Sequence, residues 1–492
     1  MTSDAEWAKL QQALTRRIGP RAVSDLEQGT IVVIPSITFP VVELDKIIGA
    51  QRYEERTLFL ALLLARPGLE MVFVTSLPVD PAIVDYYLRF LPDADDARSR
   101  LHLVTLDDRS SPALSEKLLS RPEVLARVKA LAADPAEACV VTFNVTPLEV
   151  EVCRRLGLPL YGPDPALARL GSKSGARQVA RQAGVAVLDG AEDLFSIGEV
   201  GDAARAIRAR RPEAEAVVVK LNHGFSGQGS VMVDLAGAEV PFTEAPTLFC
   251  APGESWPGYS AKVAAEGAIV EELVRVPGTV SPSVQIHVSP SGSFEVVSTH
   301  DQLLGGPGNQ VYVGCRFPAH ASYRLAIQED AVKVAEILAA AGVVGSFGID
   351  FLVVPGAGVT PLRGPLGPRP RIYLTEINLR MGGTTHPFWM ARLATGGAYD
   401  VAGGTLVAGG TAKAYVATDN FKSPSLVGRS PASVIAAVDD AGLGFDPVSA
   451  TGATLHLLGA VPDHGKVGAT CIADSPAAAE ALYQRVAALL VG

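Results

Sequence analysis

The feature that most constrains this chain is an apolar run that ends in a lysine and continues into glycines. Residues 216–219 read Ala-Val-Val-Val, Lys220 follows, and glycines stand at 224, 227 and 229. An ammonium beside a buried strand is costly to desolvate unless an anion compensates it. Glycines let backbone N–H groups approach phosphate oxygens closely. The pattern predicts a phosphate site, since a plain hairpin tip would explain the glycines but not the lysine.

A second stretch, residues 375–380, carries three polar side chains at every other position: Glu376, Asn378 and Arg380. Side chains alternate across a strand, so these three would share one face while the apolar residues between them face the core. A carboxylate, an amide and a guanidinium on one face can hold a cation and stabilise an anion. We therefore expect this strand to carry metal-binding and catalytic residues.

Asp350 lies among apolar residues in another predicted strand, residues 345–354. A buried carboxylate needs a partner or a ligand. If the two strands pair antiparallel, Asp350 faces Glu376 and Asn378 across the sheet. Close carboxylates repel unless a cation lies between them, and a set of oxygen ligands favours Mg²⁺.

The composition excludes several classes of protein. A chain of 492 residues predicts about three domains, and a formal net charge of -10 argues against a nucleic-acid binder. The longest apolar run, residues 57–65, is too short to span a membrane. Five scattered cysteines without a C-x-x-C pair disfavour disulfides and zinc, and no signal-peptide pattern opens the chain. We expect a cytoplasmic enzyme.

The first 160 residues alternate apolar β-rich runs with helical patterns. Strands are predicted at residues 31–36, 71–76, 101–106 and 138–143. This alternation predicts a parallel sheet covered on both faces. The layout is Rossmann-like, but no G-x-G-x-x-G follows the first strand, so NAD binding is not expected.

A charged cluster lies within the helix predicted over residues 44–66, directly before its apolar run at residues 57–65. It contains Arg52, Glu54 and Arg56. Ligands collect at the carboxyl ends of strands in open α/β sheets, so the cluster could line a substrate site. The alternative is a solvated first turn with ion pairs four residues apart.

Two further stretches indicate little alone and become informative together with the motifs around them. Lys173 lies between Gly171 and Gly175, which alone indicates little more than a solvated lysine. Glu271 and Glu272 interrupt a predicted strand whose backbone can bind an adenine edge, with a carboxylate for the ribose hydroxyls. Adjacent glutamates at an exposed strand end are otherwise common.

The order of these elements resembles the ATP-grasp fold of carboxylate–amine ligases. Within that superfamily the chain is similar to the pheganomycin-type peptide ligases. The similar stretches are residues 43–44, 52–56, 84–87, 298–303, 314–318, 380–387 and 423–425. The chain departs from the general pattern in an insertion between Asp350 and Glu376.

The resemblance implies a multidomain protein of mixed α/β and α+β class. A Rossmann-like pre-ATP-grasp domain would cover residues 1–162, the ATP-grasp core residues 163–398, and a small α+β domain residues 399–492. It also implies a two-step reaction with ATP and Mg²⁺. ATP would phosphorylate a small-molecule carboxylate, and the amine of an amino acid or peptide would then displace phosphate.

The expected site residues fall into four sets. The ATP set is Lys173, Lys220, Gly224, Ser226, Gly227, Gly229, Ser230, Glu271, Glu272 and Leu273. The metal set is Asp350, Glu376 and Asn378, and the catalytic set is Arg380, Arg316 and His386. The substrate set is Arg52, Glu54, Arg56, Gln302, Gly382, Gly383 and Thr384.

Two other functions stay open. A carboxylate kinase would stop at the acyl phosphate and needs the same residues. An inactive nucleotide-binding regulator would keep the fold without turnover, but it would be expected to lose a phosphate lysine or the Glu-x-Asn pair, and neither is lost. The donor, the acceptor and the oligomeric state are also open, with a homodimer as one option.

Overall fold

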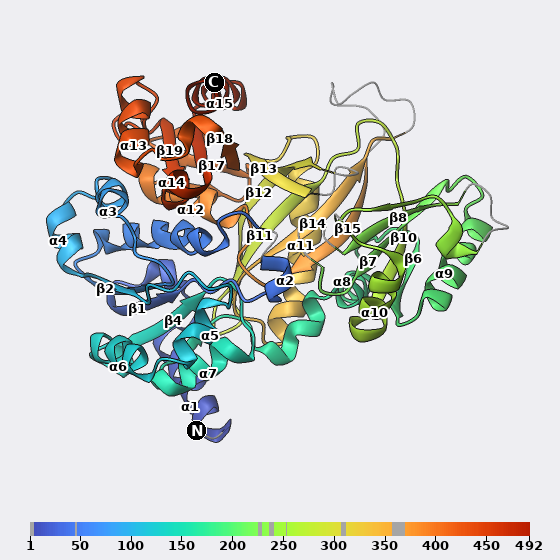
Figure 1. Cartoon of the computed structure of the whole chain (residues 1–492), viewed down its shortest axis with the longest axis horizontal. Helices are drawn as coiled ribbons and strands as arrows, with labels where there is room; N and C mark the ends of the chain where they lie inside the picture. Colours follow the sequence, from blue (N-terminus) through green and yellow to red (C-terminus); the bar gives the residue numbers. More distant parts are fainter. Residues whose placement is uncertain are drawn as a thin grey trace.

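A computed structural model describes residues 4–44, 47–224, 229–235, 241–251, 253–306, 311–356 and 370–492. Ser226 and Gly227, both expected to bind ATP, lie outside these residues. The chain forms three sheets: an N-terminal sheet, the sheet of a separate lobe that contains β7 and β8, and a long central sheet (Figure 1).

The N-terminal sheet confirms the predicted Rossmann-like layout. Its five parallel strands follow the order β3-β2-β1-β4-β5. The strands are β1 (Gln28–Ile34), β2 (Gly68–Thr75), β3 (Leu101–Thr105), β4 (Ala138–Thr142) and β5 (Leu160–Tyr161). The helices of this region are α1 (Asp4–Ile18), α3 (Pro81–Leu88), α4 (Ala94–Ser99), α5 (Leu114–Leu119), α6 (Pro122–Leu131) and α7 (Pro147–Leu156).

The helix predicted over residues 44–66 is interrupted. A short helix, α2 (Val41–Leu44), is followed by a 3₁₀ helix, η2 (Ala50–Ala65), which begins after Gly49. Gly49 has φ 72°, a backbone conformation that glycine adopts without strain. The charged cluster at the start of η2 is largely buried, so the solvated alternative is wrong.

The lobe is a five-stranded sheet in the order β6-β10-β7-β8-β9. The strands are β6 (Gly190–Leu194), β7 (Ala216–Leu221), β8 (Ser230–Asp234), β9 (Thr247–Phe249) and β10 (Ala268–Glu272). The helices α8 (Lys173–Gln182), α9 (Ile197–Arg210) and α10 (Trp256–Glu266) lie beside it. The predicted buried strand that ends near Lys220 is β7, and it pairs with β8 in an antiparallel hairpin.

The central sheet runs in the order β15-β14-β11-β12-β13-β18-β17-β16, with β20 joined to β18 and β19 to β20. Its first half contains β11 (Pro282–Val288), β12 (Phe294–Gly305), β13 (Val311–Phe317), β14 (Gly345–Val354) and β15 (Arg371–Asn378), with the helix α11 (Arg324–Ala340). Its second half contains β16 (Ala398–Asp400), β17 (Thr405–Ala408), β18 (Thr411–Lys422), β19 (Gly452–His456) and β20 (Lys466–Ala473). The C-terminal region therefore continues the central sheet through β13 and β18.

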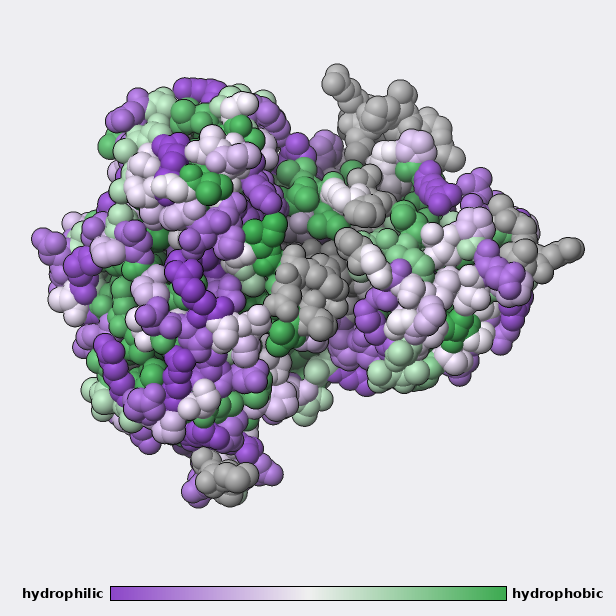
Figure 2. Space-filling view, viewed as in Figure 1, coloured by the Kyte–Doolittle hydropathy of each residue, from purple (hydrophilic) through white to green (hydrophobic). Residues whose placement is uncertain are grey.

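The remaining helices are α12 (Thr385–Thr395), α13 (Pro431–Asp440), α14 (Val461–His464) and α15 (Pro476–Val491). Polar and charged side chains cover most of the visible face of the molecule, and hydrophobic ones show in the hollow between the left-hand body and the right-hand lobe (Figure 2). Within the described ranges, no helix combines the length and the apolar character needed to cross a membrane.

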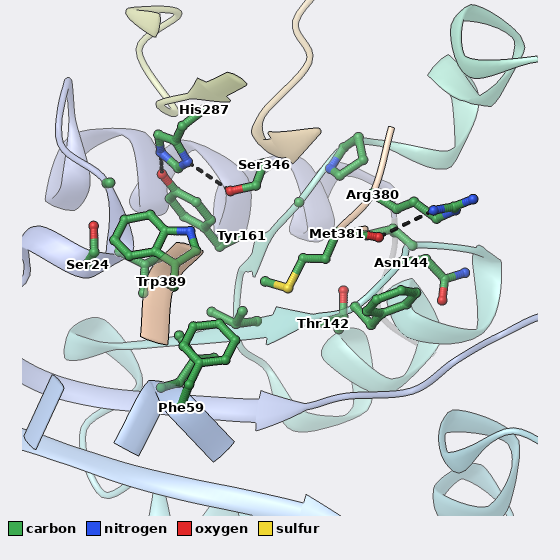
Figure 3. A pocket seen from close by; sticks show the side chains of 18 of the residues that line it. Ser24, Phe59, Thr142, Asn144, Tyr161, His287, Ser346, Arg380, Met381 and Trp389 are labelled. Atoms are coloured by element: carbon green, nitrogen blue, oxygen red, sulfur yellow. Dashed lines mark hydrogen bonds between the residues drawn. The ribbon is translucent and has the colours of Figure 1, made fainter. Parts of the chain in front are cut away.

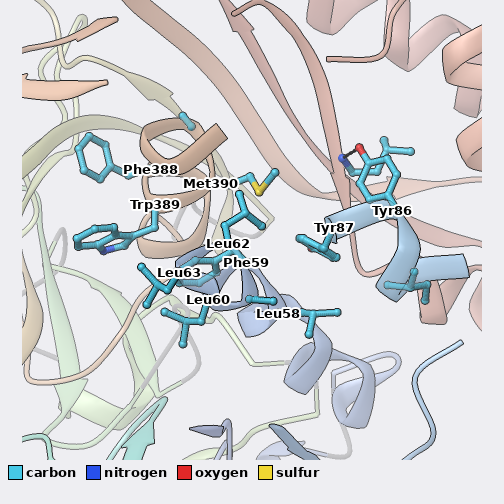
Figure 4. Close-up of a cluster of buried hydrophobic side chains, with 14 of the residues drawn as sticks. Leu58, Phe59, Leu60, Leu62, Leu63, Tyr86, Tyr87, Phe388, Trp389 and Met390 are labelled. Carbon is cyan, nitrogen blue, oxygen red and sulfur yellow. Dashed lines mark hydrogen bonds between the residues drawn. The ribbon is translucent and has the colours of Figure 1, made fainter. Parts of the chain in front are cut away.

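An apolar contact joins the N-terminal region to the part of the chain that follows β15. Side chains of η2, among them Phe59 and Leu63, face Trp389 and Met390 of α12 (Figure 4). Phe59 and Leu63 are each 2% exposed. Because residues more than 300 positions apart share this cluster, it holds the N-terminal sheet against the end of β15.

Leu63→Ala should lower the free energy of unfolding by about 2–5 kcal/mol, since it removes buried methyl groups and leaves a cavity. Urea unfolding followed by tryptophan fluorescence would measure it. The matched control is Leu489→Ala on α15, which is 39% exposed and should cost less than about 1 kcal/mol. Equal losses in the two variants would contradict the role of the contact.

Candidate active site

Two cavities meet at the end of β15. One, of about 460 Å³, opens toward the lobe and contacts β7, α8 and α10. The other, of about 510 Å³, lies between η2, β12 and the end of β18. Four residues line both: Phe39, Glu376, Asn378 and Arg380. A group bound in one cavity can therefore meet a group bound in the other at this wall.

The predicted metal residues lie where the strand pattern placed them. β14 and β15 are antiparallel, with Asp350 opposite Glu376 and Gly348 opposite Asn378. The Asn378 amide donates a hydrogen bond to Asp350 Oδ2 over 3.0 Å. The prediction that Asp350 faces Glu376 is confirmed, and the strand ends at Asn378, so Arg380 extends beyond it.

The electrostatics of this pair suit a divalent cation. Burial and the Glu376 carboxylate raise the pKa of Asp350 to about 7. Burial is the largest single influence on the pKa of Glu376 and acts to raise it, but Lys173, Arg380 and Lys220 together outweigh burial and the net shift is downward. Two carboxylates and an amide oxygen are ligands that Mg²⁺ prefers. The donor set therefore fits the ion.

Lys173 joins the lobe to the metal strand. It begins α8, and its ammonium donates to Glu376 Oε1 over 2.5 Å and to the carbonyl oxygen of Gly224 over 3.0 Å. Lys173, Gly224 and Gly229 all line the lobe-side cavity. Lys173, Gly224 and Gly229 therefore lie around the same cavity as Glu376.

Lys220 has a protein carboxylate as its anion. Its ammonium lies 3.0 Å from Glu271, which is fully buried and also forms an ion pair with Arg177. Glu272 pairs with Arg211 over 3.0 Å. The argument that Lys220 needs a phosphate to compensate its burial is therefore wrong, and both glutamates already have cationic partners.

The other expected ATP residues that the structure describes lie on the β7–β8 hairpin or directly after β10. Ser230 pairs with Lys220 across β7 and β8, and the N–H of Leu273 donates to Ala216 over 3.0 Å. Several polar residues that were not predicted as site residues also line the lobe-side cavity, among them Asn222, His223, Lys262 and Glu266. Asn222 and His223 directly follow the β7 strand, a position that could have drawn attention to them.

The second cavity receives most of the predicted substrate residues. Arg56, Gln302, Gly382, Gly383 and Thr384 line it. A Cβ atom added at Gly383 would lie 2.5 Å from the Tyr312 ring, so only glycine fits there. Arg56 is thus the member of the charged N-terminal cluster that reaches the cavity.

The structure places the other two members of that cluster elsewhere. Arg52 donates to the carbonyl oxygen of Pro78 and lies 3.7 Å from Asp463. Glu54 accepts hydrogen bonds from the N–H and hydroxyl of Ser76, at 2.6 and 2.7 Å. Burial raises the pKa of Glu54 to about 7. Arg52 and Glu54 therefore make structural contacts and do not line the cavity.

Two predicted catalytic residues also lie away from the residues that line both cavities. Arg316 is exposed and donates to Glu480 of α15 over 3.0 Å, because its neighbours Cys315 and Phe317 face the interior of the sheet. His386 is buried 3.1 Å from His456, and burial with that second ring lowers its pKa to about 3. Of the predicted catalytic set, Arg380 is the one placed at the junction of the cavities.

A buried network behind the second cavity was not predicted. Asp419 Oδ2 accepts from Arg56 over 2.6 Å and Oδ1 accepts from His456 over 2.7 Å. Asp419 lies on β18, which continues to Lys422. Ligand atoms of His386, Asp419 and His456 lie within 4.8 Å of one another, so this cluster is a second set of groups able to hold a metal ion.

Arg380 is held from the side of the N-terminal sheet. The N–H of Met381 donates to the carbonyl oxygen of Phe143, just beyond β4, over 3.0 Å. The Arg380 guanidinium lies 5.5 Å from the centre of the Phe39 ring, and burial lowers its pKa. A small cavity of about 60 Å³ is also lined in part by Arg380, Met381 and Trp389 (Figure 3).

Comparisons with known proteins match this arrangement. A family model described as "IQCH-like, ATP-grasp" matches residues 249–357, and one described as "PGM1 C-terminal domain" matches residues 433–486. The L-propargylglycine–L-glutamate ligase of Streptantibioticus cattleyicolor is 32% identical over 441 residues, 87% of this chain and 86% of that protein. The chain belongs to the ATP-grasp carboxylate–amine ligases. The IQ motif-containing protein H of Danio rerio is 21% identical over 58% of the chain and 32% of that protein.

Solved structures show the fold of this ATP-grasp ligase. The ADP complex of purK, an N5-carboxyaminoimidazole ribonucleotide synthetase, has a TM-score of 0.52 at 12% identity and covers 93% of this chain and 96% of that one. The biotin carboxylase domain of Hydrogenobacter thermophilus 2-oxoglutarate carboxylase, solved with MgADP, ADP and bicarbonate, has a TM-score of 0.53 at 13% identity and covers 92% and 88%.

If Asp350 holds Mg²⁺, the affinity of the protein for ADP with Mg²⁺ should fall as the pH is lowered. The pKa of Asp350 is raised to about 7, so the group is protonated below that pH and a cation must displace the proton. We expect the affinity to weaken by up to about tenfold per pH unit below pH 7. Calorimetry from pH 6 to 8 would measure it, with ADP in EDTA as the control. An unchanged affinity would contradict the assignment of Asp350.

Proposed function

We propose that this ligase uses ATP and Mg²⁺ to activate the carboxylate of an amino acid or peptide as an acyl phosphate and joins it to an amine. The observation that carries the proposal is the wall formed by Glu376, Asn378 and Arg380 between two cavities. One cavity would take the nucleotide and the other the acyl donor and acceptor. The Streptantibioticus relative, named for joining two amino acids, supports this substrate class.

The lobe-side cavity would hold the nucleotide phosphates. Lys173 and Lys262 supply positive charge there, and Gly224 and Gly229 leave room for a close approach. Lys173 already contacts Glu376, so a phosphate bound beside it would lie next to the metal residues. Asp350, Glu376 and Asn378 would hold Mg²⁺, which neutralises charge on the transferred phosphoryl group.

Arg380 would act on the substrate side of the wall. Its guanidinium faces both cavities, so it can stabilise the acyl phosphate and the oxyanion formed when the amine attacks. Electrostatic stabilisation is stronger in a site that excludes water, and an acyl phosphate open to water would hydrolyse. The chemistry needs no covalent nucleophile, in keeping with five buried thiols.

The experiment supplies ATP, Mg²⁺ and a panel of amino acids and peptides, then follows phosphate release and product mass. The proposal expects ADP and phosphate only when donor and acceptor are both present, with a product whose mass is their sum less one water. Phosphate release or acyl phosphate without an acceptor would instead indicate the kinase. Tight ATP binding with no turnover on any pair would indicate a regulator. The homodimer and the cytoplasmic location stay predictions from the sequence.

Glu376→Gln and Arg380→Met should each lower kcat by at least about 100-fold, because each removes charge stabilisation at the reacting group. Steady-state phosphate release on the identified pair would measure it. Arg316→Met is the matched control and should stay within about twofold, since its guanidinium pairs with Glu480 on the surface. Full activity in Glu376→Gln would refute the metal assignment.

A further inference from the structure

Two lysines lie opposite each other on neighbouring strands beside the second cavity. Lys422 ends β18, Lys466 begins β20, and the two are direct cross-strand partners. Both line the cavity. Like charges directly opposite on a sheet repel and destabilise the pair, so this arrangement is unfavourable unless an anion lies near it.

Lys466 is also buried. It is 7% exposed, its ammonium donates to the Tyr53 hydroxyl over 2.6 Å, and it lies 4.8 Å from the centre of that ring. Within the described part of the chain, neither lysine forms an ion pair with a carboxylate. Burial, with the charges of Arg56 and Lys422, lowers the pKa of Lys466, although Asp419 acts against the shift. A buried ammonium without a counterion costs several kcal/mol.

The nearest carboxylate is already engaged. Asp419 gives one oxygen to Arg56 and the other to His456. Three cations, Arg56, Lys422 and Lys466, therefore line the cavity with this one carboxylate, and Asp350, Glu376 and Arg380 line the same cavity. The metal carboxylates come from β14 and β15, whereas the two lysines come from the C-terminal strands β18 and β20.

We propose that Lys466, Lys422 and the Tyr53 hydroxyl bind a substrate carboxylate other than the one that is phosphorylated. The phosphorylated carboxylate must lie beside Glu376 and Arg380, so the anion at Lys466 belongs to a different part of the donor or to the acceptor. This inference rests on the proposed function and narrows the class of substrates that the ligase accepts. The ligase would select substrates that carry a second free carboxylate.

The first test needs no turnover. Lys466→Met should raise the thermal midpoint of the substrate-free protein, because it removes an uncompensated buried charge and keeps the side-chain length. Lys333→Met, at a surface ion pair, is the control and should change it little. A lower midpoint in Lys466→Met would overturn the claim that the lysine lacks an anion, whatever reaction the enzyme performs.

The second test measures ligand binding with ADP and Mg²⁺ present. The probes are L-glutamate, L-glutamine and L-glutamic acid α-amide, which differ in one carboxylate. Calorimetry on the wild type should show about 10- to 100-fold tighter binding of L-glutamate than of at least one amide, as expected for a hydrogen bond between charged groups. Lys466→Met should reduce that preference to about twofold and leave ADP affinity unchanged.

Lys422→Met, at an exposed position, tests the same preference if Lys466→Met does not fold, and Lys466→Arg should retain it. Equal binding of the acid and both amides to the wild type would overturn the proposal. So would a Lys466→Met variant that keeps the full preference for the acid.

A turnover assay identifies the source of the carboxylate. Hydroxylamine replaces the amine and converts the acyl phosphate to a hydroxamate and phosphate, so only the donor can then supply a second carboxylate. A higher donor KM for Lys466→Met in this assay assigns the carboxylate to the donor. An effect on the amino-acid acceptor alone assigns it to the acceptor, and no effect on either KM overturns the proposal. Failure of the ligase chemistry itself would appear as absent hydroxamate, with the thermal test and the binding test unaffected.

Discussion

The register between β14 and β15 is the constraint on which the site depends. Asp350 lies opposite Glu376 and both face the cavities, while their apolar neighbours face the core. A slip of one residue would turn these side chains into the core and bring apolar ones to the surface. The burial of Ile349, Phe351 and Ile377 opposes such a slip. Packing on one face thus fixes the chemistry on the other.

Neighbouring regions of the chain complete this strand pair. The lobe contributes Lys173 to Glu376, the N-terminal sheet supports Met381, and the C-terminal strands bring Asp419 to Arg56. Each contact joins residues far apart in the sequence. The apolar cluster of η2 and α12 holds the N-terminal part of this assembly in place (Figure 4). The two cavities are therefore products of the whole fold and of no single motif.

Charged side chains are distributed unevenly around the second cavity. At the wall, the carboxylates of β14 and β15 are balanced in part by Lys173 and Arg380. Beside Asp419 in the second cavity, the cations Arg56, Lys422 and Lys466 outnumber the one carboxylate. A substrate with two anionic groups would match both sets of residues, one anion becoming phosphorylated and the other neutralising the lysines. Substrate recognition and catalysis would then use different residues of the same cavity.

The sequence by itself was sufficient for the local features. Alternation with period two placed Glu376, Asn378 and Asp350 on one face, and alternating strands and helices predicted the parallel N-terminal sheet, because both patterns depend on neighbours along the chain. Only the tertiary structure decided which charged groups meet. It gave Lys220 the buried Glu271 as its anion, turned Arg316 toward Glu480, and brought Asp419 and Lys466 to Arg56. No spacing in the sequence encodes such pairs, since they form when separate sheets pack together.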